Sequence, residues 1–93
     1  MDKKKLSIAR KKIDRIDINI FKLIKKRTLI VKYMLSLKLY KSQIIDRRRI
    51  NEILNNIKHK SKINNIDPKI TTQIWRAIIW SFIKYQKKNF KKK

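Results

Sequence analysis

The sequence predicts an all-α fold, in which one long N-terminal helix and two shorter helices make up a three-helix protomer. Apolar residues recur at three- and four-residue steps through most of the chain, which is the spacing of one helix face. The isoleucines follow this spacing instead of the strict alternation that is typical of a strand. The 93 residues include no Gly and one Pro, so little interrupts a helix. We therefore expect a single helical domain over residues 1–93.

The first predicted helix runs from Leu6 to about Tyr40, because no Pro, Gly or turn cluster interrupts this stretch. Residues 1–5 are expected to form a frayed leader ahead of it. The apolar face of this helix consists of Ile13, Ile16, Ile20, Leu23, Ile24, Leu29, Ile30, Val31, Met34 and Leu35.

The second predicted helix follows a break in the apolar pattern at Lys41-Ser42-Gln43. Asp46 is suited to cap its first turn, since a carboxylate there accepts from free backbone N–H groups. Its end is marked at Asn64-Asn65, where Asn replaces the Gly that usually adopts a left-handed C-terminal cap. The apolar stripe between these signals is Ile50, Ile53, Leu54 and Ile57.

The third predicted helix opens at Asp67-Pro68, which fits an N-cap followed by proline at the first helical position. It is expected to continue to about Gln86, with residues 88–93 as a frayed basic tail. Its packing stripe is Ile70, Ile74, Trp75, Ile78, Ile79, Phe82 and Ile83, with Trp80 on or near it.

The length of the first helix predicts an assembly. About 35 residues make a helix about 52 Å long, whereas a compact 93-residue domain has a diameter of about 32 Å. Its apolar stripe runs nearly the full length, and two short helices supply too little surface to cover it. We expect an intertwined, helix-swapped homodimer in which the long helices pack against each other. The alternative is a helical hairpin kinked near the middle of this segment.

Composition excludes several kinds of site. The chain has no Cys, no Gly and one His, so it holds no disulfide, no Cys-ligated or His-clustered metal and no glycine-rich phosphate loop. We expect no metal and no cofactor. The longest apolar runs are a few residues, far short of the roughly 20 of a membrane span, and no apolar signal region follows the charged start. The sequence therefore predicts a soluble cytoplasmic protein that does not bind membranes.

Two basic residues on the first helix are placed to hold a small anion. Arg27 and Lys38 are eleven residues apart, three helical turns, so they share one face about 16 Å apart. Two long side chains leaning together leave a gap of small-molecule size. Arg10 lies seventeen residues before Arg27, about 25 Å along the helix, too far to touch the same ligand within one subunit. In an antiparallel dimer, Arg10 can enter the partner's site.

Polar residues on the other two helices complete the set. Gln86 continues the row of Ile79 and Phe82, so a neutral hydrogen-bonding group ends an apolar stripe and needs a partner if it is buried. Asp46 and Arg49 share a face at the start of the second helix, where a local ion pair is the alternative interpretation.

This ordered set resembles the all-helical chorismate mutases. The resemblance rests on segments 8–17, 26–27, 45–49, 67–68 and 78–79, together with Lys38 and Gln86, and covers roughly residues 6–90. No single motif is specific to this family, but the ordered set of motifs with its spacing is fairly specific. The resemblance implies a helix-swapped dimer with two active sites, each completed by an Arg from the other subunit. This agrees with the length argument, which is independent of it.

The resemblance also implies a role for each residue in converting chorismate to prephenate, on the route to phenylalanine and tyrosine. Arg27 and the partner's Arg10 match the carboxylate-binding arginines. Lys38 and Gln86 match the groups at the ether oxygen, and Asp46 and Arg49 match the pair near the ring hydroxyl and the carboxylates. Because the rearrangement is pericyclic, it needs no nucleophile or proton transfer, so a catalytic His or Cys is not required.

Two positions depart from the family pattern and leave an alternative open. Ile50 stands where many members carry Glu or Gln, and Phe82 stands where many carry Ser, so we expect these residues and Ile79 to line a more apolar pocket. The isochorismate-pyruvate lyases, which share the fold, tend to be apolar or aromatic at such positions. The lyase reaction is therefore the second hypothesis.

The third hypothesis is a basic helical protein that binds nucleic acid. The chain carries 28 Lys and Arg against 6 Asp and Glu, a formal net charge of +22, and ends in a Lys-rich tail. However, the lysines are spread from end to end, and charge runs are usually solvated faces. The aromatic residues Trp75, Phe82 and Trp80 are expected on the packing stripe instead of a basic surface, which favours the enzyme.

Overall fold

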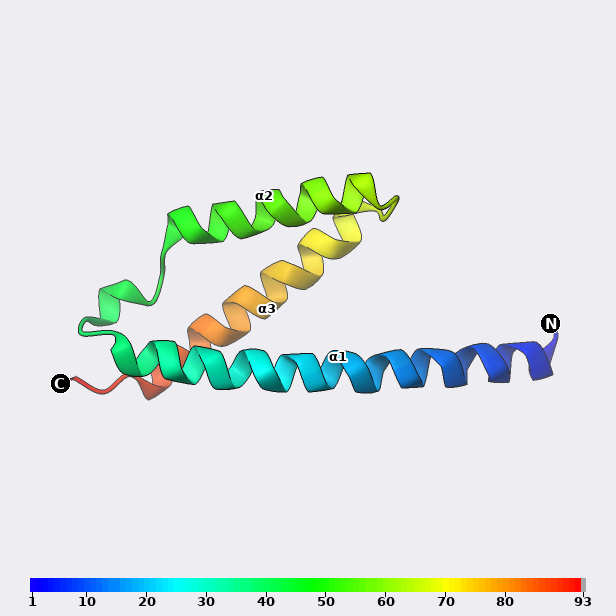
Figure 1. The fold of residues 1–93 in the computed structure, drawn as a ribbon, viewed down its shortest axis with the longest axis horizontal. Coiled ribbons are helices and arrows are strands. Elements are labelled where there is room, and N and C mark those ends of the chain that lie inside the picture. The colour runs from blue at the N-terminus through cyan, green and yellow to red at the C-terminus, as the bar shows by residue number, and fades with distance from the viewer. Residues whose placement is uncertain (93) are drawn as a thin grey trace. The chain divides into compact units, whose positions relative to one another are not determined.

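The computed structural model describes residues 1–92 and is all-α, as the sequence predicts (Figure 1). Its elements are α1 (Lys3–Leu37), the short 3₁₀ helix η1 (Lys41–Gln43), α2 (Arg47–Ile63) and α3 (Pro68–Asn89). The chain divides into two units, Met1–Lys32 and the part from Tyr33 onward, and the boundary falls inside α1. None of the helices among the described residues has the length and apolar character needed to cross a bilayer.

Helix α1 is a single uninterrupted helix of 35 residues, so the long N-terminal helix is confirmed and the kinked hairpin is wrong. It begins at Lys3, earlier than the apolar pattern predicts. The Asp2 carboxylate accepts a hydrogen bond from the Lys5 backbone N–H at 3.0 Å, and this cap makes the first turn helical. The expected leader of residues 1–5 is therefore helical from its third residue.

Helix α1 also ends three residues earlier than predicted, because a side chain takes over the bonds that would extend it. The Gln43 Oε1 atom accepts from the backbone N–H groups of Leu39 and Tyr40, at 2.8 and 2.9 Å. In a continuing helix those two N–H groups would donate to carbonyls four residues back. The chain instead leaves the helix after Leu37 and turns through η1.

Helix α2 has the two ends that the sequence predicts. Asp46 is its N-cap and accepts from the Arg49 backbone N–H at 3.0 Å. At the other end, Asn65 has the left-handed φ of 57°. The Ile66 N–H donates to the Ser61 carbonyl and the Asn65 N–H donates to the Lys62 carbonyl, at 2.9 and 3.3 Å. This pair of bonds is a Schellman motif, which satisfies carbonyls at the end of the helix.

Helix α3 begins as predicted and ends later. Asp67 accepts from the Lys69 backbone N–H at 2.9 Å, and Pro68 occupies the first helical position. The helix continues to Asn89, so the first two residues of the expected frayed tail, 88 and 89, are helical. Phe90 packs against the apolar core, and this contact holds the last turn in place. Lys93 lies outside the described residues.

Helices α2 and α3 form a hairpin joined by a short turn (Figure 1), and they enclose the core of the second unit. The core centres on Ile44, Ile79 and Ile83. Near the turn, the buried Ser61 hydroxyl lies 2.6 Å from the Thr71 hydroxyl, so a polar contact joins the two helices there. The residues packed against the core are Leu35, Ile45, Ile50, Ile53, Leu54 and Phe90.

Three residues of the predicted α3 stripe are exposed instead. Ile70, Ile74 and Trp80 are 56%, 48% and 42% exposed. The buried face of α3 runs through Ile79, Ile83 and Gln86. At about 100° per residue, Trp80 lies about 100° from Ile79 around the helix, and Ile70 and Ile74 lie about 140–180° from it. The prediction that Trp80 lies on or near the packing stripe is therefore wrong.

Candidate active site

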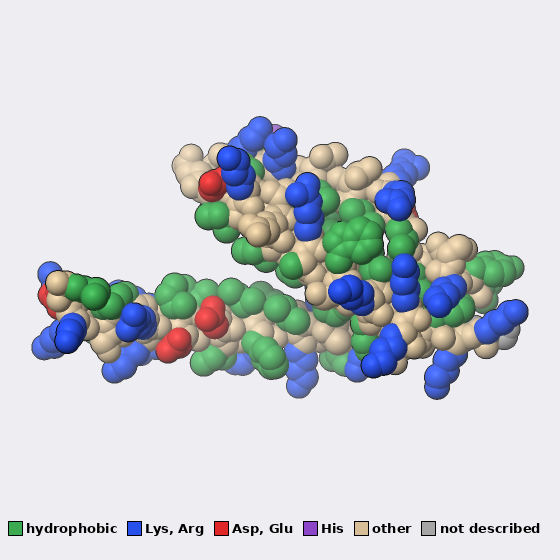
Figure 2. All heavy atoms as spheres, turned by 180° about the vertical axis from the view of Figure 1, so that it is seen from behind, with side chains coloured by type: hydrophobic (Ala, Val, Ile, Leu, Met, Phe, Trp, Pro, Cys, Tyr) green, Lys and Arg blue, Asp and Glu red, His purple; other side chains and the backbone are tan. Residues whose placement is uncertain are grey.

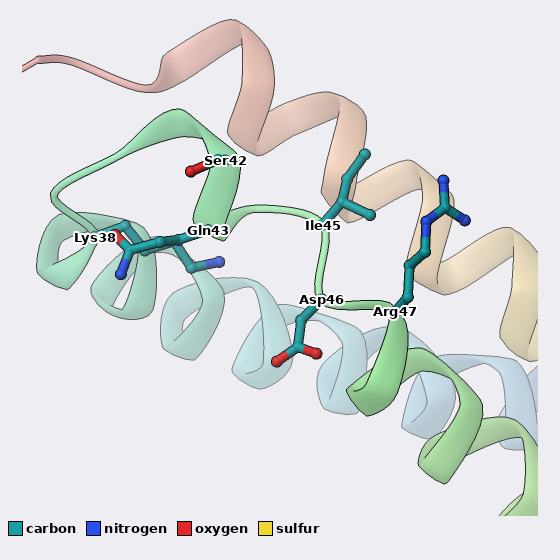
Figure 3. A pocket seen from close by; sticks show the side chains of 6 residues that line it. All are labelled: Lys38, Ser42, Gln43, Ile45, Asp46 and Arg47. Carbon is teal, nitrogen blue, oxygen red and sulfur yellow. The ribbon is translucent and has the colours of Figure 1, made fainter.

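Several polar residues of the second unit line an open hollow at the start of α2. The hollow has a volume of about 650 Å³ and is lined by Lys38, Ser42, Gln43, Ile45, Asp46 and Arg47. Figure 3 shows Lys38 and Gln43 lying alongside each other, while the side chains of Ile45 and Arg47 extend to the side opposite the Asp46 carboxylate. The end of α1, the turn η1 and the start of α2 all contribute to the site.

Lys38 and Gln86 are in direct contact, although 48 positions separate them in the sequence. The Lys38 Nζ donates to the Gln86 Oε1 at 2.5 Å. The Gln86 side chain is buried at 7% exposure, so its amide oxygen has the partner that a buried polar group requires. An ammonium group and a carboxamide are therefore held together where α3 passes the end of α1.

The environment of Lys38 acts on its charge in two opposite ways. Partial burial lowers the pKa of its ammonium, since removal from water disfavours the charged form. The Asp46 carboxylate works against this shift, because a nearby negative charge stabilises the ammonium. The net result is a pKa below the ordinary lysine value of 10.5.

Asp46 caps a helix in addition to its electrostatic effect on Lys38. Its Oδ1 atom caps α2 through the Arg49 backbone N–H, so the carboxylate is fixed at the rim of the hollow. The Arg49 guanidinium lies 3.5 Å from the Glu52 carboxylate, which Arg48 also approaches at 3.6 Å. The alternative of a side-chain ion pair between Asp46 and Arg49 is thus wrong; the local ion pairs go to Glu52.

The two other arginines lie in the first unit, on α1. Arg10 is exposed, and Arg27 is half-buried. Burial lowers the pKa of the Arg27 guanidinium, because removal from water disfavours the charged form.

Two of the three apolar residues expected in the pocket belong to the core of the second unit or pack against it. Ile79 is a central core residue, and Ile50 packs against the core from α2. Phe82 is half-buried on α3. None of the three is among the six residues that line the hollow.

Sequence reasoning assigns Lys38 and Asp46 to the site but leaves out the other four residues that line the hollow, Ser42, Gln43, Ile45 and Arg47. We treated Lys41-Ser42-Gln43 only as a break in the apolar pattern. The useful signal was a glutamine three residues after Tyr40, because a side-chain amide at that spacing reaches back to the start of a turn.

The chemistry of this arrangement is electrostatic. It offers a lysine ammonium and a carboxamide to a ligand, and the second unit supplies further cations nearby in Arg47 and Arg49. No group of three or more His, Cys, Asp or Glu side chains that could hold a metal ion occurs within residues 1–92. Such a set suits a substrate on which negative charge develops.

Comparison with known proteins assigns the chain to a family. Residues 9–87, most of its length, match the family model of type II chorismate mutase. Among individual curated proteins, none matches the chain at a significant level. The matched segment includes α2 and most of α1 and α3, so it contains every polar residue predicted for the site. The chain therefore belongs to the type II chorismate mutase family, the isomerases that convert chorismate to prephenate in aromatic amino acid biosynthesis.

Proposed function

We propose that this mutase acts at the Lys38–Gln86 pair, which binds the ether oxygen of chorismate. The observation that carries the proposal is the 2.5 Å hydrogen bond between the Lys38 ammonium and the buried Gln86 amide oxygen. This bond fixes the orientation of the Gln86 carboxamide, so its NH₂ group remains available as a donor. One cation and one neutral donor then face the same substrate atom.

The reaction itself explains why these two groups suffice. In the rearrangement the ether C–O bond breaks while a new C–C bond forms, and no proton is transferred. Negative charge grows on the ether oxygen as its bond to carbon lengthens. Donors that are already oriented toward that oxygen stabilise the transition state more than the ground state. Holding the folded conformer of chorismate removes the entropic part of the barrier.

The carboxylates of the dianionic substrate need cations of their own. We assign this role to Arg27, to Arg49 and to Arg10 of the other subunit, with Asp46 near the ring hydroxyl. Arginine suits the task because its planar guanidinium forms two parallel hydrogen bonds to one carboxylate. Substrate binding then replaces the exposed contact of Arg49 with Glu52, which is weak at the surface.

A homodimer is part of the proposal, because α1 carries apolar side chains that the first unit does not cover. Within Met1–Lys32 there is only one helix, and a lone helix has no core in which to bury an apolar face. Green side chains run along this helix between the basic ones in Figure 2. We propose that a second copy of α1 covers the exposed residues Ile8, Ile13, Ile16, Ile20, Leu23 and Ile24.

The expected location is the cytoplasm. A chain without Cys gains nothing from an oxidising compartment, and a dimer supplies the stabilisation that disulfides give to small secreted domains.

Subunit complementation tests the shared site. Arg10→Ala and Lys38→Ala are each expected to lose most activity, since each removes a cation from every site of its own homodimer. When the two variants are mixed and exchange subunits, a heterodimer carries one site with both residues intact. We expect up to about a quarter of wild-type activity in an equal mixture, because half of the dimers are mixed and each has one working site.

The same experiment has an outcome that contradicts the proposal. If subunit exchange is demonstrated by mass-tagged chains and activity still does not return, Arg10 does not serve the partner's site. Arg27→Ala mixed with Lys38→Ala is the matched control, because both residues are assigned to the same subunit's site. In that mixture, each of the two sites of the heterodimer carries one defect, so no activity is expected to return if Arg27 acts in its own subunit with Lys38.

A further inference from the structure

The turn after Lys38 is held by one side chain that the reaction as proposed does not use. Gln43 is the last residue of η1, and its Oε1 atom accepts from the N–H groups of Leu39 and Tyr40 at 2.8 and 2.9 Å. Its own backbone N–H donates to the Tyr40 carbonyl at 3.0 Å. Gln43 and Tyr40 are therefore joined by two hydrogen bonds in opposite directions, which makes this four-residue turn a closed unit.

The hydrogen bond from the Leu39 N–H to the Gln43 side chain acts directly on Lys38. The Leu39 N–H belongs to the peptide group that links Lys38 to Leu39, so the Gln43 oxygen fixes the plane of that peptide. On the other side, the Lys38 N–H donates to the Leu35 carbonyl at 3.2 Å. The backbone of Lys38 is thus held from both sides, with the end of α1 before it and Gln43 after it. Figure 3 shows the Gln43 side chain reaching back from η1 alongside that of Lys38.

The position of Lys38 matters because its side chain spans the site. Its Nζ must reach Gln86 on α3, which is a single contact at the end of a flexible four-carbon stem. If the Lys38–Leu39 peptide were free to rotate, the Lys38 side chain would start from a different direction. A displacement of about 1 Å at a reacting group costs up to about a hundredfold in rate.

We infer that Gln43 is a positioning residue for Lys38, which it serves by accepting the N–H of the Lys38–Leu39 peptide and so ending α1 at Leu37. The inference rests on the proposed role of Lys38 at the ether oxygen. It assigns to Gln43 no contact with the substrate. The required property of the side chain is its acceptor oxygen, and its NH₂ group is dispensable.

Two substitutions separate the acceptor from the rest of the side chain. Gln43→Met keeps the length and volume but has no strong acceptor, and the two exposed N–H groups turn to water, so the fold is retained. Gln43→Glu keeps an acceptor oxygen at the same place. We expect Gln43→Met to lower kcat by about 10- to 100-fold, and Gln43→Glu to restore kcat to within about threefold of the wild type. The added carboxylate is expected to raise KM, because it repels a dianionic substrate.

The pH profile supplies a readout that a merely structural role would leave unchanged. The charged groups that line the hollow with Lys38 are Asp46 and Arg47, and neither is altered. Releasing Lys38 to solvent reduces the burial that lowers its pKa. The alkaline limb of kcat/KM in Gln43→Met is therefore expected to move to higher pH. Tyr40→Ala is the control, since it truncates an exposed side chain in the same turn and keeps the N–H that Gln43 accepts.

Lys38→Ala, measured alongside, tells the two possible failures apart. If Lys38→Ala keeps wild-type turnover, the proposed function is wrong at this residue. If Lys38→Ala is inactive while Gln43→Met keeps the wild-type kcat and alkaline limb, the inference alone is overturned. It is also overturned if Gln43→Glu loses as much kcat as Gln43→Met, because the acceptor is then not the required feature.

Discussion

Two opposing requirements of the site act on a single residue, Lys38. In the role proposed for it, Lys38 must be partly desolvated to interact strongly with an ether oxygen, and it must remain charged to stabilise the negative charge that forms there. Burial alone would favour the neutral amine. The Asp46 carboxylate offsets part of the effect of burial on the pKa of Lys38. Asp46 is itself held in place because it caps α2, so one carboxylate serves both the helix and the lysine.

This dual duty predicts a shift in the pH dependence of activity. Asp46→Asn retains the cap, because Asn is as good an N-cap as Asp. It removes the negative charge that raises the pKa of Lys38, so the ammonium loses its proton at lower pH. Since the protonated form is the active one, the alkaline limb of kcat/KM should move to lower pH.

Asp67→Asn is the matched control for that experiment. It makes the same change at the N-cap of α3, roughly 28 Å along the helix from Gln86. We expect no movement of the alkaline limb in this variant. An unchanged limb in Asp46→Asn, or an equal shift in both variants, would show that Asp46 does not govern the charge of Lys38.

A site residue could be predicted from the sequence only where its role alters the apolar pattern of a helix. Gln86 was identified because it is polar in an apolar row, and a buried amide needs a partner. The sequence could not show that this partner is Lys38, because the contact depends on how α3 passes the end of α1. Gln43 was missed because a polar residue in a turn is unremarkable until its hydrogen bonds are seen.

Helix ends were predicted well wherever a local signal sets them. Asp46, Asn65 and Asp67-Pro68 act within a few residues of themselves, and the structure has each as expected. The end of α1 and the end of α3 were set instead by Gln43 and by Phe90 packing on the core, which local propensity does not register. The exposure of Ile70 and Ile74 likewise follows from how α3 is rotated against α2.

Asn65 allows a direct test at the level of the helix end. Its φ of 57° lies in the left-handed region, which costs most non-glycine residues roughly 1–2 kcal/mol and Asn less. Asn65→Ala should therefore lower the free energy of unfolding by about 1 kcal/mol, and Asn65→Gly should leave it unchanged or raise it slightly.

Urea denaturation at one fixed protein concentration measures this effect, since a dimer's stability depends on concentration. Asn55→Ala is the control, because it makes the same truncation at an exposed position within α2, where Ala is the better helix former. Equal losses at the two positions would mean that the left-handed cap does not contribute as described.

The first unit is a single helix with exposed isoleucines, and what covers them is a question about the whole molecule. If a second α1 covers them, a charge placed there should separate the subunits. Burying one isoleucine side chain is worth about 1.5–3 kcal/mol, and a symmetric dimer counts every such residue twice. Ile20→Glu should therefore yield monomers at concentrations where the wild type is dimeric, as measured by light scattering after size exclusion.

Loss of the dimer should also abolish activity, because Arg10 then has no partner site to enter. Lys25→Glu controls for added negative charge, since position 25 lies on the face of α1 opposite to Ile16. It should remain dimeric and active. A wild-type protein that is monomeric and fully active at assay concentration would contradict the shared site.

Product analysis tests the central claim most directly, because it depends on neither the dimer nor any single residue. The protein is incubated separately with chorismate and with isochorismate, and the products are separated and identified. The account predicts prephenate from chorismate, with Ile50 in the core as a tolerated departure from the family pattern. Preferential release of pyruvate and salicylate from isochorismate, or no turnover of either compound, would contradict it.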